Sequence, residues 1–375
     1  MPLREIFCQN NPVRLLISAF HTDKVAHAYI FAGIEGVGKF KTAREFAKLL
    51  LCPTPVIEND FADSCGKCPS CTDFEAGTHP DFQHVYKELL EFTEEGKDKK
   101  TPIDLSIDVI RDFVIKKVPI KPSLSDRKVF VISEGERLNK DSQNALLKVL
   151  EEPPAYCTII LLCTRLENLL PTIKSRSQTI RFGPVSEERI VAKLVQSGFD
   201  EQTSIFLARF SQGSLGNALS LAELERAGAQ IIQTKKELVK ELANLQYQQA
   251  ITLSENFLKK SKQIAAVWSK TDEKTSKSDI NRRAAKIIIH TIISALTDAM
   301  KVNTKGSKAI INLDQVEQIQ KIAKKFPPEQ AGEKIADAYR TIQQLDSNVN
   351  EKLIFDRLLL KLADSDNINV LYSND

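Results

Sequence analysis

The chain has 375 residues, of which 42% are hydrophobic and 27% are charged, and its formal net charge is +3. This length exceeds one ordinary domain and provides enough apolar residues for two or three separate cores. Because positive and negative charges nearly balance, the composition excludes a nucleic-acid binder that works alone through a dense basic surface, and any DNA contact should be local or shared.

The N-terminal residues argue against export, and the longest apolar segment argues against a membrane span. The first residues, Met1 to Phe7, lack the basic-then-apolar pattern of a secretion signal. The longest apolar segment, residues 284–296, is interrupted and too short to cross a bilayer, so we expect a buried helix there. We therefore predict a cytoplasmic protein with no membrane contact. Its seven cysteines should be thiols or metal ligands and not disulfides.

The first predicted elements surround a phosphate-binding loop. Residues 27–32 have the pattern of a buried strand and residues 40–51 that of a helix. Between them lies Gly33-Ile-Glu-Gly-Val-Gly-Lys39, in which backbone N–H groups can surround phosphates and the lysine can reach the outer ones. The next position normally carries a Ser or Thr that binds magnesium, but here it is Phe40.

This pattern predicts nucleotide binding without the usual metal. The candidate residues for binding ATP or ADP are Gly33, Gly36, Gly38 and Lys39. Their phosphate contacts do not need the missing hydroxyl, so a nucleotide could be held without being hydrolysed. An empty, vestigial pocket is the alternative.

A cysteine cluster follows the first helix. Cys65, Cys68 and Cys71 have CxxCxxC spacing, and Cys52 at the end of the helix can supply a fourth thiolate. Four thiolates suit a tetrahedral Zn2+ ion in a closed site, which folds a polar segment and does not catalyse. We therefore predict a structural zinc module at residues 52–71. Unliganded thiols, an iron–sulfur cluster, or His79 in place of Cys52 are the alternatives.

Two further segments predict buried strands. Residues 128–133 and 158–163 are continuous apolar runs, typical of parallel strands covered on both faces. The first run ends in Ser133-Glu134, where hydrolytic phosphate-loop proteins place an Asp that helps to hold magnesium. With Phe40 and Ser133 both altered, hydrolysis should fall by orders of magnitude. We expect no intrinsic ATPase activity.

The strands stop near Gly183-Pro184, and helical patterns continue from there to the C-terminus. The predicted fold class is an α/β P-loop domain with a parallel sheet, followed by a small helical lid and an all-α domain. The predicted boundaries are 1–182 for the nucleotide-binding-like domain, 183–225 for the lid and 226–375 for the helical C-terminal domain.

Several motifs together resemble one family. They are the loop 33–39, the inserted cysteine module with His79-Pro-Asp81, the helix that ends in Leu150-Glu-Glu-Pro-Pro154, and Ser175-Arg176-Ser177. Through them the chain resembles the delta-prime subunits of the bacterial DNA polymerase III clamp loader, which are members of the AAA+ ATPases. The resemblance extends from the N-terminus to about residue 220.

The resemblance implies a role for Arg176. In the family this arginine reaches the ATP site of a neighbouring subunit as an arginine finger, and a guanidinium suits that task because it is always charged and can bind two phosphate oxygens. An arginine paired with a local carboxylate is the alternative from chemistry alone. The resemblance also places Gly216 where active relatives carry an arginine that senses the outer phosphate.

The implied partners are those of a clamp loader: gamma/tau-like ATPases, a delta-like subunit, and, through the complex, the sliding clamp and primed DNA. The C-terminal domain would join the subunits in a collar. Two other functions stay open at this point. One is an ATP-hydrolysing gamma/tau-like subunit, and the other is a zinc-stapled interaction protein of another AAA+ assembly.

Overall fold

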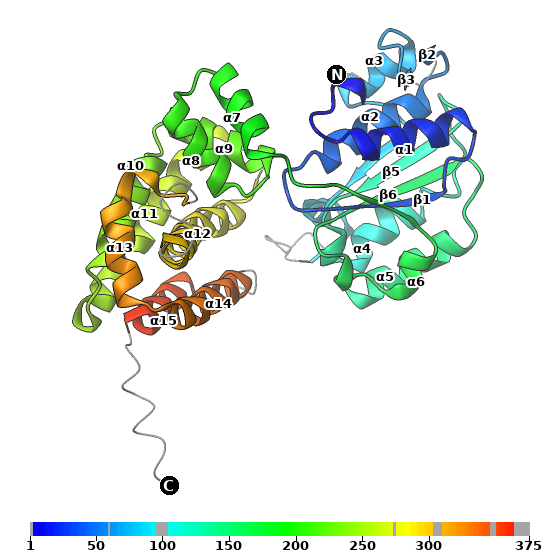
Figure 1. Ribbon diagram of the computed structural model, residues 1–375. Helices are drawn as coiled ribbons and strands as arrows, with labels where there is room; N and C mark the ends of the chain where they lie inside the picture. The colour runs from blue at the N-terminus through cyan, green and yellow to red at the C-terminus, as the bar shows by residue number, and fades with distance from the viewer. Residues whose placement is uncertain are drawn as a thin grey trace. The chain divides into compact units, whose positions relative to one another are not determined.

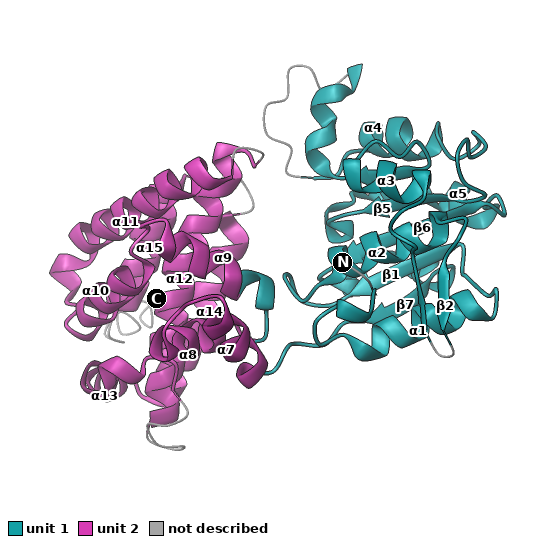
Figure 2. Ribbon diagram, turned by 90° about the horizontal axis from the view of Figure 1, so that it is seen from above, with its two compact units in different colours: residues 1–186, 213–217 teal, residues 187–212, 218–375 magenta. Residues whose placement is uncertain are grey.

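A computed structural model of the chain describes residues 3–58, 61–94, 104–272, 275–302, 310–345 and 350–363. The chain forms two compact units, shown in Figures 1 and 2. Unit 1 is Met1–Ser186 with Gly213–Asn217, and unit 2 is Glu187–Gln212 with Ala218–Asp375. Unit 1 contains a parallel sheet with helices and unit 2 is helical, which confirms the predicted fold class.

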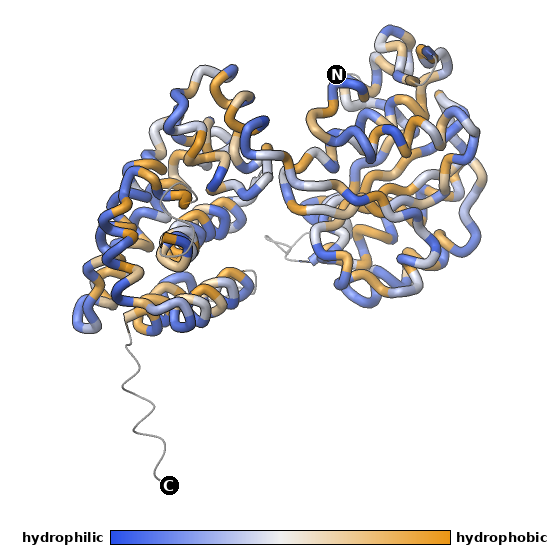
Figure 3. The backbone as a smooth tube through the Cα atoms, in the orientation of Figure 1, coloured by the Kyte–Doolittle hydropathy of each residue, from blue (hydrophilic) through white to orange (hydrophobic). Residues whose placement is uncertain are grey.

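Unit 1 is built on a five-stranded parallel sheet with the strand order β4-β5-β6-β1-β7. The strands are β1 (Ala28–Ala32), β4 (Phe82–Val85), β5 (Lys128–Ile132), β6 (Cys157–Cys163) and β7 (Gln178–Arg181). Every residue of β1, β5 and β6 is buried, which explains their continuous apolar runs, seen in orange in Figure 3. Because all strands run the same way, the loops that follow β1, β5 and β6 meet at one edge of the sheet.

Helices cover both faces of this sheet. On one face, α1 (Asn10–His21) and α2 (Lys39–Leu51) enclose a core that includes Tyr29 and Phe46. On the other face, α4 (Ile107–Ile110) and α5 (Lys140–Glu151) enclose a core that includes Ile30. Neighbouring residues of β1 thus enter opposite cores, as side chains alternate along a strand.

A small insertion separates α2 from β4. It consists of a hairpin of β2 (Val56–Glu58) and β3 (Phe61–Asp63), which pair antiparallel, followed by α3 (Pro69–Ala76). Helix α6 (Pro171–Ser175) leads into β7. The short helices are η1 (Leu3–Glu5), η2 (Lys87–Phe92), η4 (Arg111–Ile115), η5 (Gly135–Arg137), η6 (Leu166–Asn168), η7 (Tyr247–Gln249) and η9 (Leu313–Gln315).

Unit 2 consists of helices arranged around a long central one. They are α7 (Glu187–Gln196), α8 (Glu201–Phe210), α9 (Leu215–Arg226), whose first turn belongs to unit 1, α10 (Ile231–Ala243), α11 (Ala250–Thr271), α12 (Lys277–Val302), α13 (Val316–Lys325), α14 (Pro328–Leu345) and α15 (Glu351–Ala363). The central α12 contains the predicted apolar helix 284–296 and packs against α10, α11, α13 and α14. None of the helices in the described ranges combines the length and apolarity that a membrane crossing requires.

Candidate functional site

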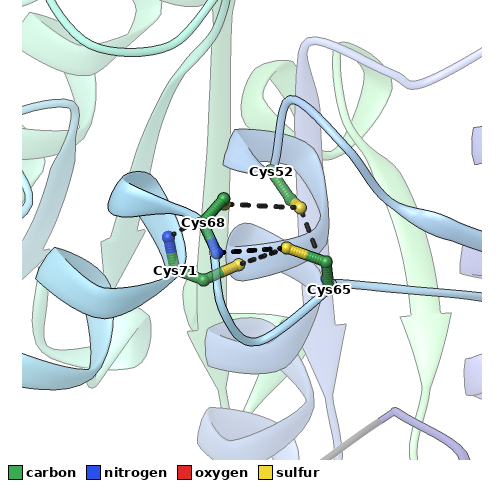
Figure 4. A group of neighbouring side chains, drawn as sticks. All are labelled: Cys52, Cys65, Cys68 and Cys71. Carbon is green, nitrogen blue, oxygen red and sulfur yellow. Dashed lines mark hydrogen bonds between the residues drawn. The ribbon is translucent and has the colours of Figure 1, made fainter.

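The four predicted thiol ligands lie together between the end of α2 and the start of α3, as Figure 4 shows. The Sγ atoms of Cys52, Cys65, Cys68 and Cys71 are all within 4.8 Å of one another. The Sγ–Sγ distance is 3.9 Å from Cys52 to Cys68 and 4.0 Å from Cys65 to Cys71. Tetrahedral zinc with Zn–S bonds of about 2.3 Å separates its sulfurs by about 3.8 Å, so this cluster has the right size for Zn2+.

Backbone N–H groups also point at these sulfurs. The N–H of Cys65 donates to Cys52 Sγ at 3.4 Å, that of Cys68 to Cys65 Sγ at 3.3 Å, and that of Cys71 to Cys68 Sγ at 3.4 Å. Such donors stabilise thiolates and orient them, as the outer hydrogen bonds of metal sites do. The donor set therefore fits a structural metal ion.

His79, the alternative fourth ligand, has both ring nitrogens engaged elsewhere. Its Nδ1 accepts the N–H of Asp81 at 3.1 Å, which leaves Nε2 as the donor to Ser70 Oγ at 2.9 Å. The Ser70 hydroxyl donates in turn to the carbonyl of Leu51 at 2.7 Å. Burial lowers the pKa of His79, which favours this neutral form. The histidine thus connects the cysteine-bearing helix α3 to the end of α2.

The phosphate loop lies where the sequence predicts it, between β1 and α2. Gly36 and Gly38 have φ angles of +76° and +101°, a left-handed conformation that favours glycine. The Nζ of Lys39 donates to the carbonyls of Gly33 at 2.6 Å and Ile34 at 2.7 Å. Burial lowers the pKa of this lysine. The side chain that should meet phosphates is therefore bonded to the loop's own carbonyls.

The two altered magnesium positions meet at a histidine from β4. The ring of Phe40 lies 4.6 Å from that of His84, centroid to centroid, and His84 Nε2 is 2.9 Å from Ser133 Oγ. Tyr86 stacks on the histidine with a centroid distance of 4.9 Å. Mg²⁺ takes oxygen ligands, chiefly carboxylates, water and phosphate oxygens. An aromatic and imidazole cluster thus joins the two positions at which the sequence predicts lost magnesium ligands.

The burial of His84 makes a pH effect on stability measurable. Burial lowers the pKa of His84 to about 4, whereas the unfolded chain binds this proton near pH 6.5. As the pH falls below 6.5, His84 becomes protonated in the unfolded state but stays neutral in the folded state. The free energy of unfolding therefore decreases until about pH 4. Between pH 7 and pH 5 we expect His84 to cost about 2 kcal/mol. Urea unfolding of the wild type and His84→Gln at both pH values measures this.

The difference between the two proteins isolates His84, because all other titrating groups are shared. Among them is His290, whose pKa burial also lowers to about 4. His84→Gln should lose about 2 kcal/mol less than the wild type between pH 7 and pH 5. Equal losses would show that His84 is not held neutral beside Phe40.

The acidic groups at this edge of the sheet are bonded within the chain. Glu134, which could otherwise activate water, pairs with Arg137 at 3.0 Å and with Lys87 at 3.7 Å. Glu136 accepts both the N–H and the hydroxyl of Thr164, at 3.0 and 2.6 Å. Burial raises the pKa of Glu134. Hydrogen bonds thus join the loop after β5 to the loop after β6, and an ion pair joins it to Lys87 after β4.

Arg176 follows α6 and is paired but accessible. Its Nη2 lies 3.0 Å from Glu151 Oε1, and its Nη1 donates to the carbonyl of Thr172 at 3.3 Å. The side chains of Arg176 and Glu151 are 37% and 50% exposed. Exposed ion pairs contribute about 0–1 kcal/mol, so this pair could exchange for a phosphate at little cost. The sequence singled out Arg176 but neither Glu151 as its partner nor His84, and no spacing signal marks those two residues.

Two family models match the chain. The one described as "DNA polymerase III, delta subunit" matches residues 8–186, and the one described as "DNA polymerase III, delta subunit, C terminal" matches residues 277–364.

Individual relatives agree with this result. DNA polymerase III subunit delta' of Escherichia coli K12 is 27% identical over 350 residues, which cover 92% of each chain. Subunit delta' of Bacillus subtilis 168 is 30% identical over 219 residues, 58% of this chain and 59% of the relative. Subunit gamma of Buchnera aphidicola is 31% identical over 226 residues, 59% of this chain and 57% of the relative. The last two matches thus span little more than half of each relative.

Proposed function

The chain belongs to the DNA polymerase III delta subunit family, whose two models match residues 8–186 and 277–364, and from this premise we propose that it is a delta-prime-like clamp-loader subunit that does not hydrolyse ATP. The observation that carries the proposal is the cluster of Phe40, His84 and Ser133 at the magnesium positions. Without an oxygen ligand from the loop or a carboxylate from β5, a bridging metal ion loses both of its protein anchors.

The catalytic contribution of this subunit would be made in trans by Arg176. Its guanidinium is partly exposed and pairs with the half-exposed carboxylate of Glu151, so a more strongly charged phosphate can displace that carboxylate. The partner would be a neighbouring gamma/tau-like ATPase, whose transition state the guanidinium stabilises. The finger role therefore needs no metal in this chain.

The remaining assignments follow from the same role. A delta-like subunit would complete the assembly, the helical C-terminal domain 226–375 would join the collar, and the sliding clamp and primed DNA would be reached through the complex. The division into residues 1–182, 183–225 and 226–375, and the cytoplasmic location, stay predictions. Zn2+ bound by Cys52, Cys65, Cys68 and Cys71 would be structural. ATP or ADP bound by Gly33, Gly36, Gly38 and Lys39 would not turn over.

A gamma-type ATPase is the second candidate, because a gamma subunit is among the relatives and Lys39 is retained. That function would need Glu134 to activate water. The ion pairs of Glu134 with Arg137 and Lys87 argue against this function, because they engage the carboxylate that would have to accept a proton from water.

ATP turnover by the isolated full-length chain separates the two candidates. With magnesium present we expect phosphate release no faster than the background without protein, because both metal anchors are replaced. Lys39→Ala serves as the control for contaminating ATPases and should give the same rate as the wild type. Brisk magnesium-dependent hydrolysis that Lys39→Ala abolishes would establish the gamma-type function instead.

A further inference from the structure

Residues 213–217, which we call the strap, lie directly on the phosphate loop within unit 1. The hydroxyl of Ser214 donates to the carbonyl of Glu35 at 2.7 Å, and the N–H of Gly216 donates to the carbonyl of Gly36 at 2.8 Å. Strap and loop are 179 positions apart in sequence for the first of these bonds. The contact is therefore a tertiary one, made between the first turn of α9 and the middle of the loop.

Strap and loop approach each other so closely that only glycines fit at the contact. A Cβ added to Gly216 would lie 2.8 Å from the Cα of Gly36 and 3.0 Å from its carbonyl oxygen. A Cβ added to Gly36 would lie 2.3 Å from Ser214 Oγ. Real Cβ atoms do not come this close to backbone, so any side chain at position 216 would push the strap away from the loop.

The strap is also fixed at its N-terminal end. The carbonyl of Gly213 accepts the N–H of Val185 at 2.9 Å, and Gly213 has a φ of +85°. A Cβ on Gly213 would lie 2.5 Å from the Cβ of Pro184. Ser214 Oγ in addition accepts the N–H of Asn217 at 3.2 Å, which caps the first turn of α9. The strap is thus fixed by its own hydrogen bonds and close contacts as well as by its bonds to the loop.

Four carbonyls of the loop are hydrogen-bonded within the chain. Its carbonyls at Gly33 and Ile34 accept from Lys39, and those at Glu35 and Gly36 accept from the strap. A phosphate that Lys39 contacts would have to draw its ammonium group away from two carbonyls, while the strap holds the carbonyls of Glu35 and Gly36 in place. Each lost bond reduces the net gain of binding.

We propose that the strap is a built-in competitor for nucleotide, so that ATP or ADP binds only to molecules in which residues 214–216 have lifted from the loop. This inference rests on the proposed ability of the loop to bind nucleotide and adds the regulation of that site. When only a fraction of molecules is competent, the apparent Kd rises in inverse proportion to that fraction. Opening the strap should therefore tighten nucleotide binding although it adds no contact to the ligand.

The test is the affinity of the full-length chain for a fluorescent ADP analogue, measured with EDTA and again with magnesium. Gly216→Ala should bind about tenfold or more tightly than the wild type, because its Cβ cannot enter the closed contact. Ser214→Ala removes two hydrogen bonds, the one to the carbonyl of Glu35 and the one from the N–H of Asn217, without adding an atom, and should tighten binding about two- to tenfold. Lys39→Ala should weaken binding in every background, which shows that the analogue occupies the loop.

Gly332→Ala is the matched control, since Gly332 lies in α14 and an added Cβ would have no neighbour within 4 Å. It should bind like the wild type. If Gly216→Ala and Ser214→Ala bind no more tightly than the wild type, the strap is not a competitor, whether or not the wild type binds the analogue. Because Ser214→Ala introduces no clash, misfolding of Gly216→Ala cannot hide this result. The finger role of Arg176 is measured in the assembled complex and is unaffected by either outcome.

Discussion

Replacing Arg176 with alanine is expected to lower ATP turnover by an assembled clamp loader about 10³-fold or more, while the subunits still assemble. The guanidinium would stabilise charge on the phosphate that a neighbouring subunit transfers, and alanine leaves that charge uncompensated. Among the residues that the structure describes, the Arg176 side chain pairs with Glu151 and donates to the carbonyl of Thr172, and it is 37% exposed, so its loss should not disturb the core. The measurement is steady-state phosphate release by this chain reconstituted with gamma/tau-like and delta-like subunits of the same organism.

Arg44→Ala provides a matched control for this experiment. Arg44 is 35% exposed and pairs with Glu75 at 2.6 Å, so it resembles Arg176 in exposure and in having a glutamate partner. Its removal should leave turnover within about twofold of the wild type, because an exposed ion pair contributes little. Arg176→Lys should recover only part of the activity, since an ammonium cannot bind two phosphate oxygens side by side. Full turnover in Arg176→Ala would show that the finger role is wrong.

Removing the metal should unfold the cysteine module and leave the sheet of unit 1 folded. Structural zinc contributes about 10–16 kcal/mol to the folding of zinc-finger peptides, far more than the few contacts of this small module can replace. Cys68→Ser removes one thiolate but keeps a side-chain acceptor at the N-cap of α3, where Cys68 Sγ accepts the N–H of Cys71, so its effect reports the loss of the metal ligand. We expect it to lose the bound zinc, to become sensitive to proteolysis within residues 52–76, and to unfold at a lower temperature.

Zinc content by atomic emission spectroscopy and limited proteolysis measure these effects. The wild type should contain about one zinc per chain. Cys8→Ser should keep its zinc, because Cys8 is outside the cluster of four cysteines. Zinc content that is unchanged by Cys68→Ser would contradict this ligand set, and iron in the purified wild type would favour the iron–sulfur alternative.

The buried centre of the fold could be predicted from the sequence, whereas its edges could not. β1, β5 and β6 are buried along their whole length, so each is a continuous apolar run. β4 and β7 lie at the two edges of the sheet, and only one residue in each is fully buried, Val85 and Ile180. Short edge strands with mostly polar or half-exposed residues carry no periodic signal. The hairpin of β2 and β3 escaped prediction for the same reason.

The candidate sites divide along a similar line. Local spacing predicts the phosphate loop and the two altered positions Phe40 and Ser133, and it predicted the grouping of the four cysteines, because these patterns depend on residues close together in sequence. The contact of His84 with Ser133 depends on the pairing of β4 with β5, which sets His84 beside Val131. The packing of the strap on the loop likewise depends on residues 36 and 216, which are far apart in sequence. Contacts of this kind arise only when distant segments are brought together.

The most direct measurement is a cryo-electron microscopy structure of the assembled clamp loader with magnesium and a non-hydrolysable ATP analogue. We expect the Arg176 guanidinium to have left Glu151 and to lie about 3 Å from phosphate oxygens bound to the neighbouring subunit. Phe40 should still cover His84, with no magnesium bound in this chain's own loop. The contradicting result would be magnesium and nucleotide coordinated in that loop, with Arg176 still paired to Glu151 and distant from the neighbouring subunit. It would show that this chain neither acts through Arg176 on its neighbour nor lacks a metal site of its own.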